Sequence, residues 1–123
     1  MLVQVEVVGV RIEMPSNQPI VLLKEIDGTR FLPIWVGAVE ATAIAFAQQG
    51  LEAQRPLTHD LIRDLLEQLD TTLTSVHITS IKDGVFYADL LLRNSAGALE
   101  PLSVRPSDAI AVALRTKSNI MVS

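Results

Sequence analysis

The stretch "VRPSDAIAVALR" places an arginine, a serine and an aspartate directly before a run of alanines and aliphatic residues. Arg105 could bind a phosphate through two parallel hydrogen bonds, or pair with a nearby acid and stabilise the fold. Pro106 is typical of the first position of a helix, so Asp108 would stand third, where a carboxylate accepts free backbone N–H groups. Asp108 is therefore open to two interpretations, a helix cap and a ligand for a divalent cation. Ser107 lacks the sequence context of a nucleophilic serine.

A second polar cluster lies in "RPLTHDL". His59, at an exposed helix start, could be a general base, a general acid or a metal ligand, because imidazole titrates near neutral pH. Thr58 is predicted to cap this helix, and Asp60 to stabilise its positive end. Arg55 precedes a proline, as Arg105 does, and has the same two interpretations, a phosphate contact and a structural ion pair.

An internal repeat relates the first cluster to another acidic residue. A shift of 68 residues places Glu40 opposite Asp108 and aligns two alanine-rich segments. We therefore predict a duplicated β3α unit that covers about residues 3–54 and 75–123. Glu40 would start the first repeat helix as Asp108 starts the second, and two carboxylates at related positions could hold Mg²⁺ or Mn²⁺.

Each repeat is predicted to contain three strands and one helix. Period-two alternation predicts a strand from Val3 to Ile12, and Asp27-Gly28 predicts a hairpin with a type I′ turn. Helix formers predict a helix over 38–49, with Gly50 as its stop. The second half repeats these elements as "VHITSI", "GVFYADLLLR", "ALEPLSV" and "PSDAIAVALR", with Asp83-Gly84 as a second hairpin turn.

The remaining segments complete an α+β fold in a single domain over residues 1–123. An amphipathic helix over about 58–70 is predicted between the repeats, and its apolar face would cover the sheet. That face consists of Leu61, Ile62, Leu65, Leu66 and Leu69. The alanine-faced repeat helices would pack centrally or against a partner chain. The apolar tail 120–122 would add an edge strand to a mixed or antiparallel sheet, in this subunit or another.

The composition limits the class of protein. Hydrophobic residues make up 49% of the chain and charged residues 20%, which is typical of a folded globular protein. The sequence has no cysteine, which excludes a disulfide framework and thiolate metal sites. A net charge of −4 disfavours tight binding to nucleic acid unless a local basic patch or a metal ion contributes. Neither a signal-peptide pattern nor a membrane span is present, so we expect a cytoplasmic protein without membrane contact.

The chain resembles the bifunctional nuclease family of bacteria and plants. The points of likeness are "LPIWVGAVEATAIA", "RPLTHDL", "DGVFYADL" and "RPSDAIAVALR", in that order, and they span nearly the whole chain. The resemblance implies a β-rich α+β fold, an oligomer and a nuclease that acts on DNA and RNA. One departure is the segment "LLEQLDTTLTSV", which lacks the glycine expected after the middle helix.

Within these motifs we expect a nuclease that depends on Mg²⁺ or Mn²⁺. The expected metal ligands are Glu40, Asp60 and Asp108. The expected catalytic residues are His59, Asp60, Arg55 and Arg105, with His59 transferring the proton and an arginine stabilising the charge on the phosphate. Two alternatives stay open: a non-catalytic oligomeric binding or regulatory module, and a sensor of anions or nucleotides that uses two helix N-termini. We expect a homodimer or homotrimer.

Overall fold

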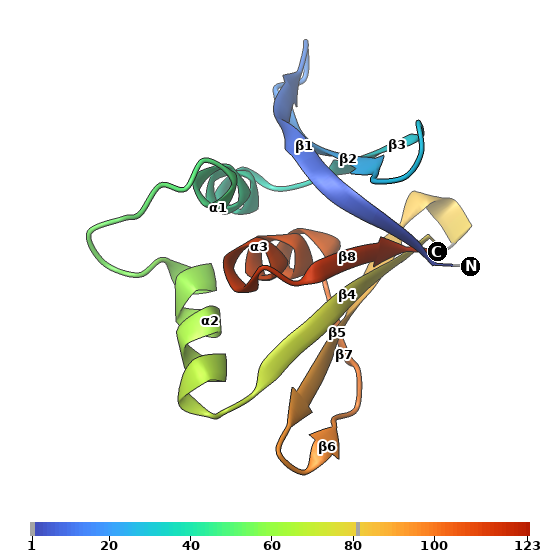
Figure 1. Ribbon diagram of the computed structural model, residues 1–123. Helices are drawn as coiled ribbons and strands as arrows, with labels where there is room; N and C mark the ends of the chain where they lie inside the picture. Colours follow the sequence, from blue (N-terminus) through green and yellow to red (C-terminus); the bar gives the residue numbers. More distant parts are fainter. Residues whose placement is uncertain (1, 81) are drawn as a thin grey trace.

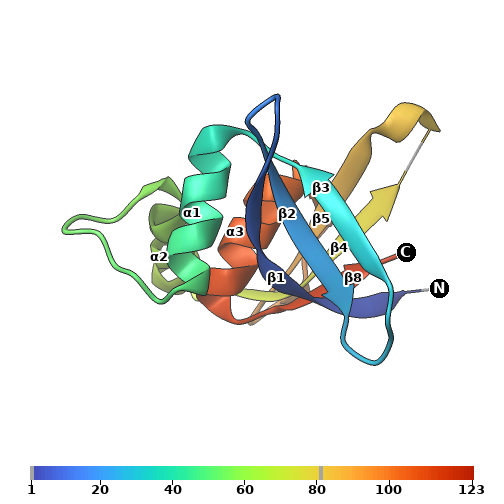
Figure 2. The same cartoon turned by 90° about the horizontal axis from the view of Figure 1, so that it is seen from above.

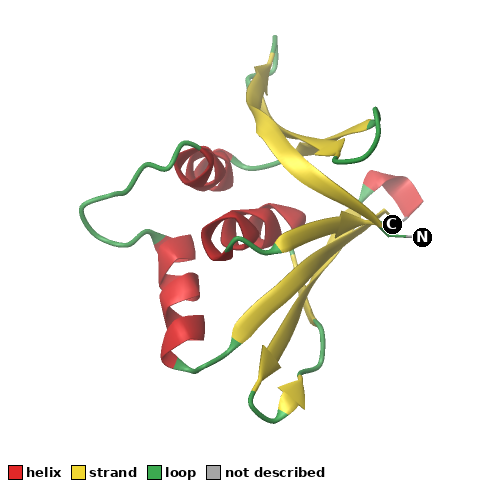
Figure 3. Ribbon diagram, viewed as in Figure 1, coloured by secondary structure: helices red, strands yellow, loops and turns green. Residues whose placement is uncertain are grey.

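The structure is a computed structural model that describes residues 2–80 and 82–123, and it has the predicted α+β architecture. A strongly curved sheet carries the three α-helices on one side (Figures 1 and 3). The helices are α1 (Ala38–Gln48), α2 (Thr58–Gln68) and α3 (Pro106–Thr116), and a short 3₁₀ turn, η1, covers Lys82–Gly84. The strands are β1 (Val3–Glu13), β2 (Gln18–Glu25), β3 (Phe31–Trp35), β4 (Thr72–Ser80), β5 (Phe86–Asn94), β6 (Gly97–Ala98), β7 (Leu102–Val104) and β8 (Asn119–Val122). None of the described helices is long and apolar enough to cross a membrane.

The C-terminal strand β8 lies in the middle of the sheet. The strand order is β3-β2-β1-β8-β4-β5-β6, with β7 also paired to β5, and β3 forms one edge (Figure 2). β8 runs antiparallel to β1 and parallel to β4. The predicted edge strand is therefore wrong: both sides of β8 have hydrogen-bonded neighbours in the same chain, and the side chain of Ile120 is buried between the two halves.

The two halves of the chain repeat the same elements, as the sequence predicted. The bounds of α1 and α3 differ by the predicted 68 residues, and β3 corresponds to β7. The predicted strand "ALEPLSV" is reduced to β7 and the two-residue β6, because Pro101 has no N–H group for a ladder hydrogen bond. The predicted strand "VHITSI" begins earlier, at Thr72, and its last residue, Ile81, lies outside the described residues.

The turn predicted at Asp27-Gly28 is wrong, since neither residue has the positive φ that a type I′ turn requires. A five-residue loop joins β2 to β3 and is closed by Glu25 and Arg30. The Glu25 N–H donates to the Arg30 carbonyl at 3.0 Å, and the Arg30 N–H donates to Glu25 Oε1 at 3.0 Å. Nε of Arg30 also forms an ion pair with Oε1 of Glu25 at 2.8 Å, and these contacts close the loop in place of a tight turn. Gly50 follows α1 with a φ of 69°, and this stop is confirmed.

Helix α3 is the most deeply buried helix among those described. Residues Ala109 to Ala113 are at most 1% exposed, and α1 and α2 both pack against this helix (Figure 1). Small side chains let α3 sit close to its neighbours and to the sheet, so the prediction of a central alanine-faced helix is confirmed. Large buried side chains from both repeats complete one core: Val21, Leu23, Ile44, Val76, Ile78, Ile110 and Val112.

Helix α2 packs mainly against α3. Its main contact with the sheet is a smaller one, with β4. Its predicted apolar face is therefore correct only in part. Ile62 and Leu66 pack against the core, whereas Leu61, Leu65 and Leu69 are 51%, 49% and 68% exposed. Because α3 separates α2 from most of the sheet, the narrow stripe formed by Ile62 and Leu66 is enough to pack α2 against the core.

Candidate active site

All three predicted acidic residues stand at the third position of their helices. Glu40, Asp60 and Asp108 follow the N-cap residues of α1, α2 and α3 by three positions. A carboxylate there meets free N–H groups and the positive end of the helix dipole. In α2, Asp60 Oδ2 accepts the N–H of Leu57 at 2.9 Å, and Leu57 is the N-cap instead of the predicted Thr58. Asp60 therefore caps the start of its helix, as its structural interpretation predicted.

Asp108 is turned toward a histidine from another helix. Nε2 of His59 lies 2.8 Å from Oδ1 of Asp108. His59 is buried, whereas a quarter of the Asp108 side chain is exposed. An ionised carboxylate only accepts hydrogen bonds, so Nε2 of the imidazole is the donor, and in the neutral form of the ring Nδ1 carries the lone pair. Asp108 thereby assigns the tautomer in which Nδ1 is the basic nitrogen.

The ring of His59 lies at the wall of a hollow. Nδ1 makes no hydrogen bond to any of the described residues. Every fully buried side-chain nitrogen or oxygen of these residues has a hydrogen-bond partner. The His59 side chain as a whole is 6% exposed. A ring that is held by a carboxylate at one nitrogen and borders a hollow is a candidate general base.

Arg105 holds the starts of α1 and α3 together. Its Nε and Nη2 donate to Asp108 at 2.8 and 3.1 Å, and Nη2 lies 3.5 Å from Oε2 of Glu40. The Arg105 side chain is 64% exposed, and Nη1 has no partner among the described residues. The guanidinium thus stabilises the fold and still offers one nitrogen to a phosphate oxygen, so both interpretations of Arg105 apply.

These contacts keep the Asp108 carboxyl ionised. Burial raises the pKa of Asp108, but hydrogen bonds from Arg105 and His59 outweigh that effect and hold the pKa below its ordinary value. The same hydrogen bond to Asp108 raises the pKa of the Arg105 guanidinium. Asp108 is therefore a carboxylate and Arg105 a cation at neutral pH.

The four side chains border a hollow of about 520 Å³, here called the histidine hollow. Its polar lining includes Glu40, His59, Arg105 and Asp108, and its apolar wall includes Ile62 and Leu102. A second hollow of about 570 Å³, the tryptophan hollow, is lined by Trp35, Gly37, Phe86, Arg105, Pro106 and Ser107. Arg105 is common to both, and polar groups that converge on a concave surface are the usual mark of a binding site.

Asp60 is directed to a different partner, Arg115. Oδ1 of Asp60 accepts a hydrogen bond from Nε of Arg115, whose side chain is 4% exposed. The other guanidinium nitrogens donate to the carbonyls of Ala111 and Ala43 at 2.9 and 3.0 Å. Burial raises the pKa of Asp60, but the Leu57 N–H and Arg115 outweigh it and lower the pKa. Asp60 and Arg115 therefore tie α1, α2 and α3 together.

Arg115 was missed by the sequence analysis, although the repeat contained a signal. The repeat places Arg115 opposite Ala47, so a long cation stands in α3 where the matching helix has a methyl group. Such a difference inside an otherwise apolar helix indicates a buried charge with a partner elsewhere in the fold.

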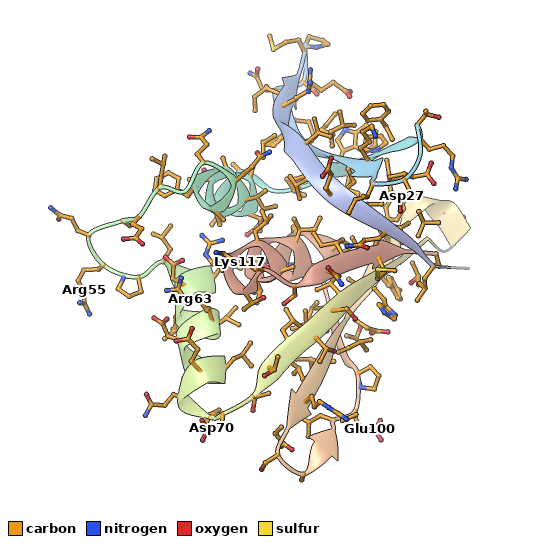
Figure 4. All side chains as sticks on the ribbon, viewed as in Figure 1. Asp27, Arg55, Arg63, Asp70, Glu100 and Lys117 are labelled. Atoms are coloured by element: carbon orange, nitrogen blue, oxygen red, sulfur yellow. The ribbon has the colours of Figure 1, made fainter. Side chains whose placement is uncertain are left out.

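The structure brings Glu40, His59, Arg105 and Asp108 together, but not Asp60 and Arg55. Arg55 lies in the loop between α1 and α2 and points away from the helices (Figure 4), and it lines neither hollow. Among the described residues, no group of three His, Cys, Asp or Glu side chains is placed to hold a metal ion. Glu40, Asp60 and Asp108 thus do not form such a group.

Comparisons with known proteins point to one family. The model of the bifunctional nuclease domain matches residues 21–123. An uncharacterized protein of Mycobacterium tuberculosis is 51% identical over 97% of this chain and 70% of its own length. Bifunctional nucleases 1 and 2 of Arabidopsis thaliana are 30% and 28% identical over 88% and 89% of this chain. The match covers 34% and 35% of those two plant proteins.

Proposed function

The chain belongs to the bifunctional nuclease domain family, and we propose that it hydrolyses phosphodiester bonds of DNA, RNA or both at the histidine hollow. The observation that carries this proposal is the hydrogen bond between His59 and Asp108 beside Arg105. It joins a base, an orienting carboxylate and a phosphate-binding cation in one concave site, which are the roles that phosphodiester hydrolysis needs.

In the proposed reaction a water molecule attacks the phosphorus atom and gives its proton to Nδ1 of His59. Asp108 stabilises the imidazolium that forms, through the hydrogen bond it already makes. Nη1 of Arg105 donates to a phosphate oxygen and stabilises the negative charge that grows in the transition state. The bond from phosphorus to the leaving nucleoside oxygen breaks, and that oxygen takes a proton from solvent.

The carboxylates of Glu40 and Asp108 fit a divalent cation in type and number. Both contact the same guanidinium, so they lie near one position of positive charge. Mg²⁺ is commonly held by one or two carboxylates together with the phosphates of the substrate. When bound, Mg²⁺ or Mn²⁺ would neutralise phosphate charge and acidify a bound water. We assign Asp60 no contact with the cation, because it pairs with Arg115 and does not line the histidine hollow, whereas Glu40 and Asp108 do.

The decisive experiment is cleavage of labelled single-stranded DNA, duplex DNA and RNA by highly purified protein in Mg²⁺, Mn²⁺ or EDTA. His59→Ala and the double variant His59→Ala/Asp108→Asn are compared with His77→Ala. His77, the other histidine, lies on β4 and lines neither hollow. We expect wild type and His77→Ala to cleave equally and both His59 variants to lose cleavage. Equal cleavage by all four proteins would refute the proposal.

One observation favours a second function, a non-catalytic oligomeric binding or regulatory module, in one form a sensor of anions or nucleotides. Asp108, Arg105 and Glu40 already have partners within the chain, so their charges are explained without catalysis. This alternative predicts that a nucleotide raises the unfolding temperature of the protein while no condition yields cleavage. The cleavage experiment therefore separates the two functions.

The proposal also includes a homodimer or homotrimer in the cytoplasm. Leu61, Leu65 and Leu69 form an exposed apolar stripe along α2, and a stripe of this kind is typical of an interface. Light scattering of the purified protein would give the subunit number. Leu65→Glu should shift the protein toward the monomer if the stripe is buried between subunits, whereas an unchanged mass would exclude this interface.

A further inference from the structure

The tryptophan hollow lies where two helices begin. Gly37, the N-cap of α1, lines it together with Pro106 and Ser107, the first residues of α3. The first N–H groups of a helix have no partner within the helix, and the dipole makes that end positive. The carboxylates of Glu40 and Asp108 already stand at these two helix starts, so the positive charge that favours an anion in this hollow comes mainly from Arg105, which also lines it.

Ser107 supplies an independent sign of a ligand. Ser107 is 7% exposed, and its hydroxyl makes no hydrogen bond to the described residues. None of the fully buried side-chain oxygens and nitrogens of the described residues lacks a partner, so the Ser107 hydroxyl is not one of them. Ser107 lines the tryptophan hollow. Ser107 is therefore a nearly buried residue at the wall of that hollow, with no hydrogen bond from its hydroxyl to the described part of the chain. A buried polar group of this kind is normally satisfied by a partner, which here must come from the hollow.

Two aromatic residues line the same hollow. Trp35 ends the edge strand β3 and is 51% exposed, and Phe86 begins β5 and is partly buried. An exposed indole beside a phosphate-binding position can stack on a nucleobase, and such stacking accepts any base because every base has a π face. Arg105 lines both hollows, so a strand bound in one hollow would continue past the other.

We propose that the tryptophan hollow binds one nucleotide of a single-stranded DNA or RNA next to the phosphodiester in the histidine hollow. The phosphate contacts the Ser107 hydroxyl and the start of α3, and the base stacks on Trp35. A base inside a duplex is already stacked and paired, so an unpaired strand fits this site and a duplex does not. The inference rests on the proposed function for the identity of the neighbouring hollow.

The chain contains a single tryptophan, so its fluorescence reports on this hollow alone. We would titrate the His59→Ala protein in EDTA, where the strand stays intact, with oligothymidine and oligouridine of about eight nucleotides. The same oligonucleotides carrying a dye give the Kd by anisotropy for variants without the tryptophan. A duplex of similar length, a mononucleotide and inorganic phosphate serve as comparison probes.

We expect both oligonucleotides to quench the fluorescence and to bind at least tenfold more tightly than the duplex or the mononucleotide. Trp35→Leu should raise the Kd roughly five- to hundredfold, the range expected for loss of one stacked base. Ser107→Ala should raise it severalfold, and Trp35→Phe should keep most of the affinity. The matched control is Phe31→Leu, because Phe31 is 54% exposed on the same strand and lines no part of this hollow.

Equal Kd values for Trp35→Leu, Ser107→Ala and Phe31→Leu would overturn the inference, as would binding of the duplex or mononucleotide as tight as that of the single strand. If Trp35→Leu fails to fold, as judged by circular dichroism, Ser107→Ala and the quenching of the Trp35 fluorescence still decide the outcome. Binding in EDTA is measured apart from cleavage. A strand that binds through Trp35 without being cleaved by wild type would refute the proposed function and leave this inference intact.

Discussion

Nε2 of His59 lies 2.8 Å from Oδ1 of Asp108, which joins the first turn of α2 to the first turn of α3 across 49 residues of sequence. Each residue by itself has an ordinary explanation at a helix start. Together they have the geometry of an oriented base, because the carboxylate fixes which ring nitrogen carries the lone pair.

Asp108→Asn should abolish this orientation, since an amide can donate to the ring and stabilise the wrong tautomer. We expect kcat for nucleic-acid cleavage to fall about 100-fold or more, with the variant still folded. Steady-state kinetics and circular dichroism measure the two properties. Asp64→Asn is the matched control, because Asp64 lies on α2 and pairs with the partly exposed Arg63. Equal kcat values for both variants would contradict the assignment.

Gly37→Ala should displace the Glu40 carboxylate without straining the backbone. A Cβ at position 37 would lie 2.4 Å from Oε1 of Glu40, whereas the φ of −75° at Gly37 suits any residue. We expect the free energy of unfolding to change by less than about 1 kcal/mol, as for other Gly to Ala changes at an N-cap. The rate of cleavage and its dependence on Mg²⁺ or Mn²⁺ should change in the same direction as in Glu40→Gln. Loss of activity in Glu40→Gln with normal activity in Gly37→Ala would show that the observed carboxylate position is unimportant.

The two arginines that precede prolines should differ in their effects. Arg105→Lys keeps the charge but removes the fork that contacts Asp108 and offers Nη1, so kcat/KM should fall about tenfold or more. Arg55→Ala should have a smaller effect, because Arg55 lies on an outward loop (Figure 4) and can act only through long-range attraction. Kinetics at two salt concentrations would reveal the difference, and a larger loss for Arg55→Ala would reverse the assignment.

Asp60→Asn should destabilise the fold by about 2–3 kcal/mol at pH 7, because it weakens the hydrogen bonds of a charged group and leaves the buried Arg115 without its carboxylate. Urea unfolding gives the free energy. Asp64→Asn, whose ion pair with Arg63 is partly exposed, should stay within about 0.5 kcal/mol of wild type. Equal loss in both variants would mean that the contact with Arg115 contributes no more than a surface pair.

Stability should decline in acid because of the same carboxylates. The pKa values of Asp60 and Asp108 are held below the ordinary value of 3.8, so the unfolded chain takes up protons first as the pH falls. The stability they contribute is complete above about pH 5 and is lost as the pH falls through their folded pKa values. Urea unfolding from pH 7 to 3 should show a plateau followed by this decline. In Asp60→Asn the decline should be shallower, and an equal slope would assign the effect to other groups.

Local signals in the sequence determined the secondary structure and the repeat. Pro106 and Asp108 marked the start of α3, Gly50 marked the end of α1, and the offset of 68 residues related α1 to α3, because capping and periodicity depend on residues a few positions apart. The turn at Asp27-Gly28 was predicted wrongly because the Glu25–Arg30 pair closes a longer loop, and that pair involves residues outside the dipeptide.

The tertiary structure decided which partners the equivalent residues have. Asp60 and Asp108 occupy the same position in their helices, yet they have different partners. The packing of α2 on α3 pairs Asp60 with Arg115 and Asp108 with His59. The sequence brought no signal for the central place of β8, since a short apolar tail fits an edge as well as a gap between strands. Helix starts are fixed by neighbours along the chain, whereas the site is fixed by contacts between segments that only the folded core brings together.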